Sequence, residues 1–488
     1  MQCVLIANRG EIAVRIIKAL RDLNIKSALV ISDPDRESLA ANMADIVLPI
    51  GGQTALESYL DVNKILQAAK QVKADGIHPG YGFLSEKVEL VDACEKAGIK
   101  FIGPGRKAIE IMGDKIKSRQ LMISGGVPVV PGFELNNSMA AANILEEVHR
   151  VGFPIMVKAA SGGGGKGMRA VHNEQDLISS IESCRREAIS SFSDSRIFIE
   201  KLIENPRHIE IQIFGDSRGN IVHLNERECS IQRRHQKVIE EAPASFDLMD
   251  LRSQMGEVAV KAAKLVDYEG AGTVEFIFSP SGDFYFLEMN TRLQVEHPVT
   301  ELTHGVDLVS TQIKVADGNS LPWSQADLKP KGHALEVRLY AEDPLQDFMP
   351  TPGTLLHLNW PKERDWLRLD IGVQKFSKVS PFYDPMIAKL IVLADNRMQA
   401  IERMLRVLGE LEIVGVVTNQ AFLIEVLSQA KFRSGDIHTS FIQDTEIVQS
   451  LRSKLENSLE IFLSLAPALH RRDAKLDNDH AFKVEADK

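Results

Sequence analysis

A row of chemically active side chains runs along one short segment of the chain. Acidic, amide and guanidinium groups occupy every second position there, and apolar or small residues fill the gaps. Successive side chains of an extended chain point to opposite faces, so a strand would present these polar groups on one face. Carboxylate and amide oxygens suit Mg²⁺ or Mn²⁺, and a planar guanidinium suits an anion. The row therefore predicts a reaction site for anions and a hard cation. Its members are Glu288, Asn290, Arg292, Gln294 and Glu296.

A further carboxylate would face this row if the chain folds back as a hairpin. Strand-like segments flank a Pro-Ser-Gly-Asp turn signal at 280–283. A two-residue turn at 281–282 would place Glu275 directly opposite Glu288. Like charges in such a pair are destabilising, and a bound cation removes that objection. We therefore expect Glu275, Glu288 and Asn290 to bind metal, with an ordinary solvated strand face as the alternative.

The composition limits the class of protein. The chain has 488 residues, of which 44% are hydrophobic and 25% charged, which is typical of a globular protein with two to four domains. The net charge of −10 gives no electrostatic reason to expect nucleic acid or an anionic membrane as a partner. No apolar run approaches the ~18 residues of a membrane span. The N-terminus runs directly into a strand pattern, and the four cysteines are far apart, so we expect a cytoplasmic protein without a signal peptide or disulfides.

The N-terminal part, residues 1–113, alternates strand and helix patterns. This alternation predicts an α/β domain with a parallel, doubly wound sheet. The loops 8–11 and 78–83 lie at the carboxyl ends of strands, where ligands tend to bind in such sheets. A tight turn is the favoured interpretation of each loop taken alone. The expected strands are 4–7, 26–31, 76–78 and 100–102, and the expected helices are 11–23, 61–73 and 86–97.

In the central part, residues 114–317, a glycine loop at 161–167 separates strand patterns at 155–158 and 168–171. The loop satisfies G-x-G-x-x-G, but no helix follows it as a dinucleotide site would require, and Gly167 excludes a Walker A loop. We predict a flap that closes over phosphates beside Lys158, with a flexible hairpin tip as the alternative.

Two other central segments are candidates for ligand contacts. The segment 198–203 is expected to be extended, so that its backbone could contact a nucleobase edge. The charge-rich segment 226–237 is either a solvated face or part of a site.

The remaining chain falls into two parts. Residues 318–446 form a mixed region with strands expected at 331–340 and 387–393 and an amphipathic helix at 397–411. Residues 447–488 are expected to begin as a helix and to end in a charged, disordered tail.

Five stretches, in this order, make the chain resemble the biotin carboxylase family of the ATP-grasp superfamily over residues 1–446. The resemblance implies a doubly wound N-terminal domain, an ATP-grasp centre with a glycine-rich lid, and a mixed C-terminal domain that completes the site. It also implies that ATP phosphorylates bicarbonate to carboxyphosphate, whose CO₂ is captured by N1′ of biotin. The five stretches are 6–13, 78–86, 162–169, 232–237 and 288–301.

The resemblance also implies a role for individual residues. ATP would be held by Lys115, Lys158, Gly164, Gly165, Glu200, Lys201, Leu202, Ile203, His208 and His235, with Gln232 nearby. Two Mg²⁺ (or Mn²⁺) ions would be bound by Glu275, Glu288 and Asn290. Bicarbonate would be held by Arg292, Gln294, the Val295 backbone, Glu296 and Lys237. Glu296 would be the base that deprotonates bicarbonate, and Arg338 would stabilise the enolate-like biotin that forms when N1′ loses its proton.

The expected partners follow from a motif that longer members of the family contain and this sequence lacks. The sequence contains no Met-Lys dipeptide, the usual setting of a biotinylated lysine. We therefore expect biotin on a separate biotin carboxyl carrier protein, together with carboxyltransferase subunits and a homodimeric state. Segments such as 338–344 resemble acyl-CoA carboxylase α chains more than the simplest stand-alone subunits, which implies an acetyl-CoA or other acyl-CoA carboxylase of fatty acid metabolism.

Three alternatives stay open at this point. The chain could be the biotin carboxylase subunit of a pyruvate carboxylase, or another ATP-grasp carboxylating ligase. It could also be a non-catalytic nucleotide-binding protein, although such a protein would be expected to have lost a metal ligand or the base. Bicarbonate-dependent turnover of ATP separates the last alternative from the others.

Overall fold

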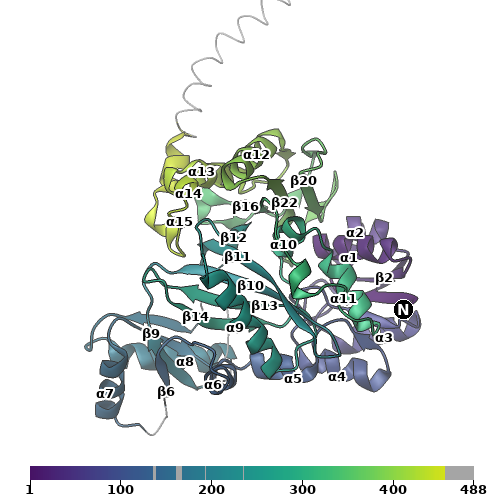
Figure 1. Cartoon of the computed structure of the whole chain (residues 1–488). Coiled ribbons are helices and arrows are strands. Elements are labelled where there is room, and N and C mark those ends of the chain that lie inside the picture. The colour runs from purple at the N-terminus through teal and green to yellow at the C-terminus, as the bar shows by residue number, and fades with distance from the viewer. Residues whose placement is uncertain (136–138, 161–166, 193, 235, 455, 457–488) are drawn as a thin grey trace, which may run out of the picture.

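The computed structural model describes residues 1–135, 139–160, 167–192, 194–234, 236–454 and 456. Within them the chain builds three larger sheets (Figure 1). The N-terminal sheet and the small four-stranded sheet lie at opposite sides of the molecule, and a long central sheet runs between them towards the C-terminal helices. The glycine loop at 161–166 and most of the tail, 457–488, lie outside the described residues.

The N-terminal sheet is parallel, as predicted, with the strand order β3-β2-β1-β4-β5. Its helix α3 begins where Asp61 accepts hydrogen bonds from the backbone N–H groups of Asn63 and Lys64, at 2.9 and 3.1 Å. Helix α4 ends at Gly98, whose φ of 67° suits a left-handed cap. The strands are β1 Cys3–Ile6, β2 Lys26–Ile31, β3 Ile46–Pro49, β4 Gly76–His78 and β5 Lys100–Phe101. The helices are α1 Gly10–Asp22, α2 Leu39–Met43, α3 Val62–Gln71, α4 Val88–Ala97 and α5 Arg106–Met112.

A four-stranded antiparallel sheet forms the small lobe of the centre, in the order β6-β9-β7-β8. The predicted strands on both sides of the glycine loop are confirmed, because β7 pairs with β8 from Ile155–Val171 to Lys158–Met168. The strands are β6 Gly132–Leu135, β7 Ile155–Ala159, β8 Met168–Val171 and β9 Ile197–Lys201. The helices of this lobe are α6 Lys115–Ser124, α7 Ala141–Val151 and α8 Leu177–Phe192.

The long sheet has eight strands in the order β14-β13-β10-β11-β12-β15-β22-β20. Strand β15 pairs with β12, so the sheet continues across the predicted boundary at 317/318 and joins the centre to the C-terminal part. Its strands are β10 Arg207–Gly215, β11 Ile221–Arg233, β12 Gln236–Ala242, β13 Gly270–Phe278, β14 Phe284–Asn290, β15 His333–Tyr340, β20 Leu367–Ile371 and β22 Met386–Ala394. The short strands beside it are β16 Glu342–Asp343, β17 Met349–Pro350, β18 Gly353–Thr354, β19 His357–Asn359, β21 Lys378–Val379 and β23 Glu412–Val414.

Helices pack on this sheet and bury its apolar side chains. Helix α12 lies on β15 and β22, and its Met404 and Leu408 belong to the same buried core as Leu339 and Leu390 of those strands. Helix α9 covers β10 and β11 at the other end. The helices are α9 Leu251–Leu265, α10 His297–His304, α11 Leu308–Ala316, α12 Arg397–Glu410, α13 Gln420–Ser428, α14 Ala430–Ser434 and α15 Phe441–Asp444. Residues 447–454 are helical, as expected for the start of the tail.

The hairpin β13–β14 has the predicted pairing but not the predicted turn. Ser279 and Asp283 are joined by a backbone hydrogen bond of 2.7 Å, so three residues form the loop in place of two. With that loop an uninterrupted ladder would put Leu287 opposite Glu275. The register shifts by one residue at Leu287, and Glu288 pairs with Glu275 after all. This β-bulge presents two consecutive side chains, Leu287 and Glu288, on the same side of the strand.

The extended chain predicted for 288–296 is wrong beyond Asn290. Strand β14 ends there, and the chain turns until helix α10 begins at His297. Buried Leu293 anchors the turn in the N-terminal core, and the His297 Nδ1 atom lies 2.7 Å from the Gln294 carbonyl oxygen. The polar side chains therefore converge because the segment 291–296 curls over the long sheet, and not because they alternate along a strand.

Candidate active site

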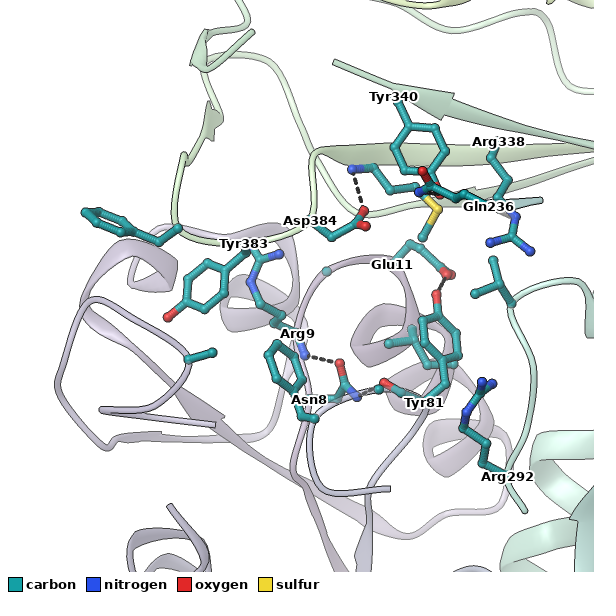
Figure 2. A pocket seen from close by; sticks show the side chains of 18 of the residues that line it. Asn8, Arg9, Glu11, Tyr81, Gln236, Arg292, Arg338, Tyr340, Tyr383 and Asp384 are labelled. Carbon is teal, nitrogen blue, oxygen red and sulfur yellow. Dashed lines mark hydrogen bonds between the residues drawn. The ribbon is translucent and has the colours of Figure 1, made fainter. Parts of the chain in front are cut away.

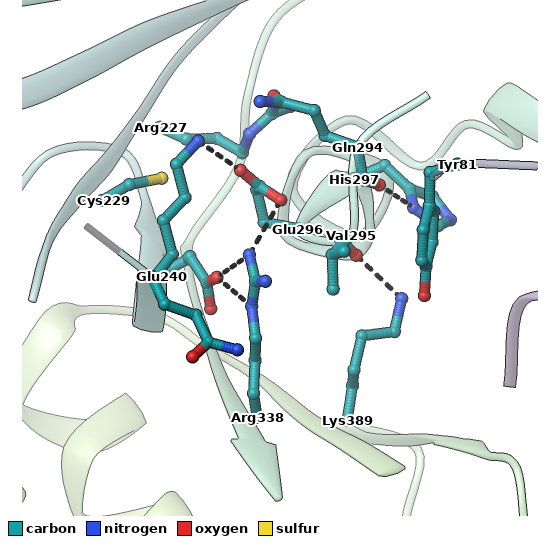
Figure 3. Close-up of polar contacts among 12 residues, drawn as sticks. Tyr81, Arg227, Cys229, Glu240, Gln294, Val295, Glu296, His297, Arg338 and Lys389 are labelled. Atoms are coloured by element: carbon teal, nitrogen blue, oxygen red, sulfur yellow. Dashed lines mark hydrogen bonds and ion pairs between the residues drawn. The ribbon is translucent and has the colours of Figure 1, made fainter. Parts of the chain in front are cut away.

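Glu296 is the centre of a buried group of charged side chains (Figure 3). Its two carboxylate oxygens accept hydrogen bonds from Lys237 at 2.6 Å and from Arg338 at 3.0 Å. Arg338 also donates to Glu240, at 2.6 Å. Lys237 lies on β12 and Arg338 on β15, so two neighbouring strands of the long sheet supply the cations that bind this carboxylate. We refer to Glu210, Lys237, Glu240, Glu275, Glu296 and Arg338 as the central cluster.

Lys237 is surrounded by carboxylates. Its ammonium donates to Glu210 at 2.5 Å, to Glu275 at 2.8 Å and to Glu296 at 2.6 Å. Burial opposes the charged form of this lysine, but the three carboxylates outweigh burial and raise its pKa well above the usual value. The lysine therefore remains a cation inside the protein.

The same contacts divide the glutamates into two kinds. Burial disfavours ionised Glu296, but Lys237 and Arg338 overcome that effect and hold its pKa well below the usual range. At Glu240 burial prevails over its contact with Arg338 and raises the pKa to about 7. Glu296 is thus an ionised carboxylate, while Glu240 can become neutral near physiological pH.

The predicted metal ligands lie at the end of a charged row across the sheet. Glu288, Glu275, Glu210 and Arg227 are cross-strand neighbours on β14, β13, β10 and β11. Burial and the neighbouring Glu275 raise the pKa of Glu288. Among the described residues none donates a hydrogen bond to the Glu288 carboxylate. Glu275 has donors within the protein, whereas its cross-strand partner Glu288 has none among the described residues. A carboxylate left without a donor beside a second carboxylate fits a divalent cation, as their oxygen chemistry predicts.

The third predicted ligand, Asn290, joins the carboxylates Glu275 and Glu288, which we call the metal pair after their predicted ligand, to Arg292. Its amide nitrogen donates to Glu275 at 2.8 Å, and its amide oxygen accepts from Arg292 at 2.9 Å. Arg292 also donates to Glu86 of the N-terminal domain, at 2.8 Å. The guanidinium that was expected to bind an anion is therefore held at the edge of the metal pair.

Gln294 and Val295 complete the segment over the cluster. Gln294 donates to Glu275 at 2.7 Å and accepts from Arg227 at 2.8 Å, so its amide is used within the protein. Val295 presents its carbonyl oxygen to Lys389, at 2.8 Å. The Val295 and Glu296 N–H groups donate to no described residue, and they precede helix α10, where free N–H groups favour an anion.

A cavity of about 540 Å³ lies between the small lobe and the long sheet. Predicted ATP contacts line it: Lys158, Glu200, Lys201, Leu202, Ile203, His208 and Gln232. Lys158 and Glu200 form a buried ion pair, and Lys201 donates to the Phe153 carbonyl oxygen at 2.8 Å. Lys115 lies in an adjoining narrow cavity together with Glu288. The predicted contacts Gly164, Gly165 and His235 lie outside the described residues.

His208 links this cavity, which we call the nucleotide cavity after its predicted ligand, to the central cluster. Its Nδ1 atom lies 3.0 Å from the Gln232 amide nitrogen, and its Nε2 atom lies 3.0 Å from Glu275. An amide N–H donating to Nδ1 leaves the ring proton on Nε2, where it faces the metal pair.

A second cavity, of about 550 Å³, opens between the N-terminal and C-terminal parts (Figure 2). Its lining includes Arg338 of the central cluster, and Arg292 and Val295 of the segment 291–296. Across it lie the two loops for which a tight turn had been the favoured interpretation. They contribute Asn8, Arg9, Glu11 and Tyr81, which face Arg338 and Tyr340 in the figure.

Sequence reasoning missed several members of these sites. Fully buried Arg227 bonds Glu210, Gln294 and Thr300 at 2.5, 2.8 and 3.0 Å. Glu210 was also missed. Its alternation with the predicted His208 along one strand was a usable signal, because both side chains point to the Glu275 face. The apolar residues of the nucleotide cavity, Met156, Met168, Ile277 and Leu287, carried no signal of their own.

None of the described helices combines the length and the apolar character needed to cross a bilayer.

Three family models match successive parts of the chain. Residues 1–109 match "Biotin carboxylase, N-terminal domain", residues 114–324 match "Carbamoyl-phosphate synthase L chain, ATP binding domain", and residues 336–444 match "Biotin carboxylase C-terminal domain". The central model is shared with another class of ATP-dependent enzymes, while the two flanking models name biotin carboxylase.

Curated relatives extend the likeness over most of the chain. The alpha chain of the mitochondrial methylcrotonoyl-CoA carboxylase of Dictyostelium discoideum is 49% identical over 90% of this chain and 63% of its own length. This chain therefore spans less than two thirds of that relative. A pyruvate carboxylase subunit of Methanothermobacter thermautotrophicus is also 49% identical, over 90% of this chain and 89% of its own.

A solved structure agrees with the fold. The biotin carboxylase domain dimer of Hydrogenobacter thermophilus 2-oxoglutarate carboxylase, in complex with MgADP, ADP and bicarbonate, superposes with a TM-score of 0.87. It is 41% identical, and the match covers 92% of this chain and 98% of that one. The domain models, the relatives and this structure agree on one family, and the chain belongs to the biotin carboxylase family of ATP-dependent carboxylating ligases.

Proposed function

We propose that this protein uses ATP and bicarbonate to carboxylate biotin, through carboxyphosphate. The observation that carries the proposal is the position of Glu296. Its ionised carboxylate is held between Lys237 and Arg338, where the metal pair and the second cavity meet. This reaction needs a base, ligands for a divalent cation and an arginine, and all three lie at this junction.

The nucleotide would bind in the cavity under the small lobe. Lys158, Lys201 and Lys115 supply positive charge there, and Ile277 and Leu287 give an apolar wall for the base. Glu275, Glu288 and Asn290 would hold Mg²⁺ (or Mn²⁺), which neutralises phosphate charge in phosphoryl transfer. The protein's part in this step is positioning, since His208 and Lys237 fix the Glu275 carboxylate.

Bicarbonate would lie against Arg292 and the N–H groups of Val295 and Glu296, which donate to no residue that the structure describes. Glu296 would accept its proton, so that the carbonate oxygen can attack the terminal phosphate. The proton acceptor needs to be ionised beforehand, and Lys237 and Arg338 keep it so. Arg338 would then stabilise the negative charge on the biotin ring when N1′ loses its proton.

The second cavity supports a separate carrier as the source of biotin. It opens between the N-terminal and C-terminal parts and ends at Arg338, so a tethered ring could enter from outside. A biotin carboxyl carrier protein and carboxyltransferase subunits would complete the enzyme, and the carboxyltransferase would select an acyl-CoA or pyruvate as acceptor. A homodimer is part of the same proposal. The four buried free cysteines support a reducing compartment such as the cytoplasm.

Release of ADP by the purified chain, with Mg²⁺ and bicarbonate, tests the proposal. Free biotin should stimulate release, and omission of bicarbonate should abolish the stimulation. Bicarbonate-dependent release that ignores both free biotin and a biotinylated carrier domain would favour another ATP-grasp carboxylating ligase. Absence of turnover in every mixture would support a non-catalytic nucleotide-binding protein.

A further inference from the structure

Lys389 is a fully buried lysine behind the segment that carries Glu296. Its side chain has 0% relative exposure, and its ammonium donates to the Val295 carbonyl oxygen at 2.8 Å (Figure 3). Lysine is rarely buried completely unless its charge is paired. The position of this ammonium under a backbone carbonyl of the site therefore needs an explanation.

The charge partners of Lys389 come from two separate parts of the chain. Glu11, from the N-terminal domain, and Asp370, on β20, each place an oxygen 3.4 Å from its ammonium. Asp370 also pairs with Arg368 at 2.8 Å. The buried carboxyl of Glu336 faces the same ammonium from β15. Lys389 thus lies inside a set of charged groups that hold it from several elements.

Glu11 connects this lysine to the loops of the second cavity. The Tyr81 hydroxyl donates to its carboxylate. Asn8 donates to the carbonyl oxygens of Pro79 and Tyr81, at 2.7 and 2.8 Å, and so fixes one loop on the other. The backbone of β20's end approaches closely, since a Cβ on Gly372 would lie 2.7 Å from the Glu11 nitrogen. The position of Glu11 is therefore fixed from both sides.

The carbonyl that Lys389 binds belongs to the peptide between Val295 and Glu296. The N–H of the same peptide is that of Glu296, which donates to no described residue. A cation on the carbonyl oxygen fixes the plane of this peptide and strengthens its N–H as a donor. Lys237 and Arg338 hold the Glu296 side chain, and Lys389 holds its backbone.

We propose that Lys389 is a positioning residue for bicarbonate, which acts by fixing the Val295–Glu296 peptide, with Glu11 as its charge partner from the N-terminal domain. This inference rests on the proposed function. It assigns a role in the reaction to a side chain that touches neither the nucleotide cavity nor the metal pair.

The test compares bicarbonate affinity with nucleotide affinity in Lys389→Met. Binding of ¹³C-bicarbonate in the presence of MgADP, followed by NMR, needs no turnover. We expect the bicarbonate Kd and KM to rise about tenfold, because a charge-assisted hydrogen bond contributes roughly that factor. The Kd of MgADP should stay within about twofold of the wild-type value, because a tenfold change needs about 1.4 kcal/mol and no nucleotide contact is altered.

Lys201→Met is the matched control. Lys201 also donates to backbone carbonyl oxygens, those of Gly152 and Phe153, but it lines the nucleotide cavity. It should weaken MgADP binding and leave bicarbonate binding nearly unchanged. If Lys389→Met fails to fold, the double variant Glu11→Gln/Lys389→Met removes the lysine together with one buried countercharge and takes its place.

The outcomes separate this inference from the proposed function. A bicarbonate Kd within about twofold of wild type in a folded Lys389 variant overturns the positioning role. Equal weakening of bicarbonate and MgADP also overturns it, because that result indicates general damage. Wild-type protein that binds bicarbonate but does not carboxylate biotin contradicts the proposed function alone. Wild-type protein that binds no bicarbonate overturns both.

Discussion

The nucleotide cavity and the central cluster lie side by side on one sheet, yet they are built in different ways. The cavity is lined by apolar side chains such as Ile277 and Leu287 together with polar ones, among them the buried ion pair of Lys158 and Glu200. In the central cluster every charged side chain already has a charged partner: Glu210, Glu275 and Glu296 share Lys237, and Glu240 pairs with Arg338. The cavity is an open volume with a mixed lining, whereas ion pairs fix the charged groups of the cluster before any ligand binds. Substitutions should therefore have large, localised effects in the cluster and small, graded effects in the cavity.

The largest effect is expected for Glu296→Gln. The amide keeps the size of the side chain but cannot accept the bicarbonate proton, so biotin-dependent ADP release should fall by about 10²- to 10⁴-fold. MgADP binding, measured by calorimetry, should stay nearly unchanged, because no nucleotide contact is lost. Loss of nucleotide affinity to the same extent as the loss of rate would show that cluster and cavity are not separate.

Arg338→Ala should separate the two halves of the reaction. The loss of positive charge at the biotin ring should reduce biotin carboxylation by about 10²-fold. Bicarbonate-dependent ATP cleavage should fall by less, because Glu296 keeps its contact with Lys237 and Glu240 can protonate to remove its own charge. Arg338→Lys, which keeps the charge without the planar fork, is the control. Equal losses in both assays would argue against a role on biotin.

Leu287→Ala tests the nucleotide cavity. The substitution removes part of the apolar wall, so the KM for ATP should rise roughly 3- to 10-fold. The KM for bicarbonate should not change, because Glu288 keeps its pairing with Glu275. Steady-state kinetics with each substrate varied in turn gives both values. A larger change for bicarbonate than for ATP would contradict the assignment of this wall.

The smallest effect is a pH-dependent difference in stability at Glu11. Burial, opposed in part by Lys389, raises the pKa of Glu11 to about 7, above its unfolded value. Its contribution to stability is therefore fully present below the unfolded pKa and is lost as the pH rises through about 7. From pH 5.5 to 8, the free energy of unfolding of wild type should fall by roughly 2 kcal/mol relative to Glu11→Gln.

Urea denaturation at several pH values measures this difference. Tyr81, Lys389, Asp370 and Arg368 surround the Glu11 carboxyl, and they are unchanged in the variant. Exposed Glu37→Gln is the control, and its stability should follow wild type at every pH. A parallel course of wild type and Glu11→Gln would mean that this carboxyl is already ionised across the range.

Local sequence patterns predicted the strands and the hairpin pair well, because those features depend on neighbours in the chain. Glu275 and Glu288 were placed opposite each other correctly, although by way of a shorter turn than the one observed. The extended chain after Asn290 was not correct. Buried Leu293 and the start of α10 decide its path, and both depend on distant packing.

The rest of the site depends on contacts that no local pattern contains. Lys389 is a buried cation within an apolar strand pattern, and only the pairing of β22 with β15 and β20 brings it beside Arg338 and Asp370. The loop residues Glu11 and Tyr81 had the sequence of ordinary tight turns. They line the second cavity because residues of the C-terminal part, far away in the chain, lie opposite them.

The bulge at Leu287 has a consequence for how this hairpin tolerates insertions and deletions. Without Leu287, Phe286 and Glu288 would continue a regular ladder against Phe276 and Glu275, and the carboxylates would still face each other. Leu287, which lines the nucleotide cavity, is thus an addition to a hairpin that is complete without it. Changes of length at this one point would alter the shape of the nucleotide cavity and leave the spacing of the carboxylates intact. Substrate fit and metal binding could accordingly diverge independently among proteins that share this hairpin.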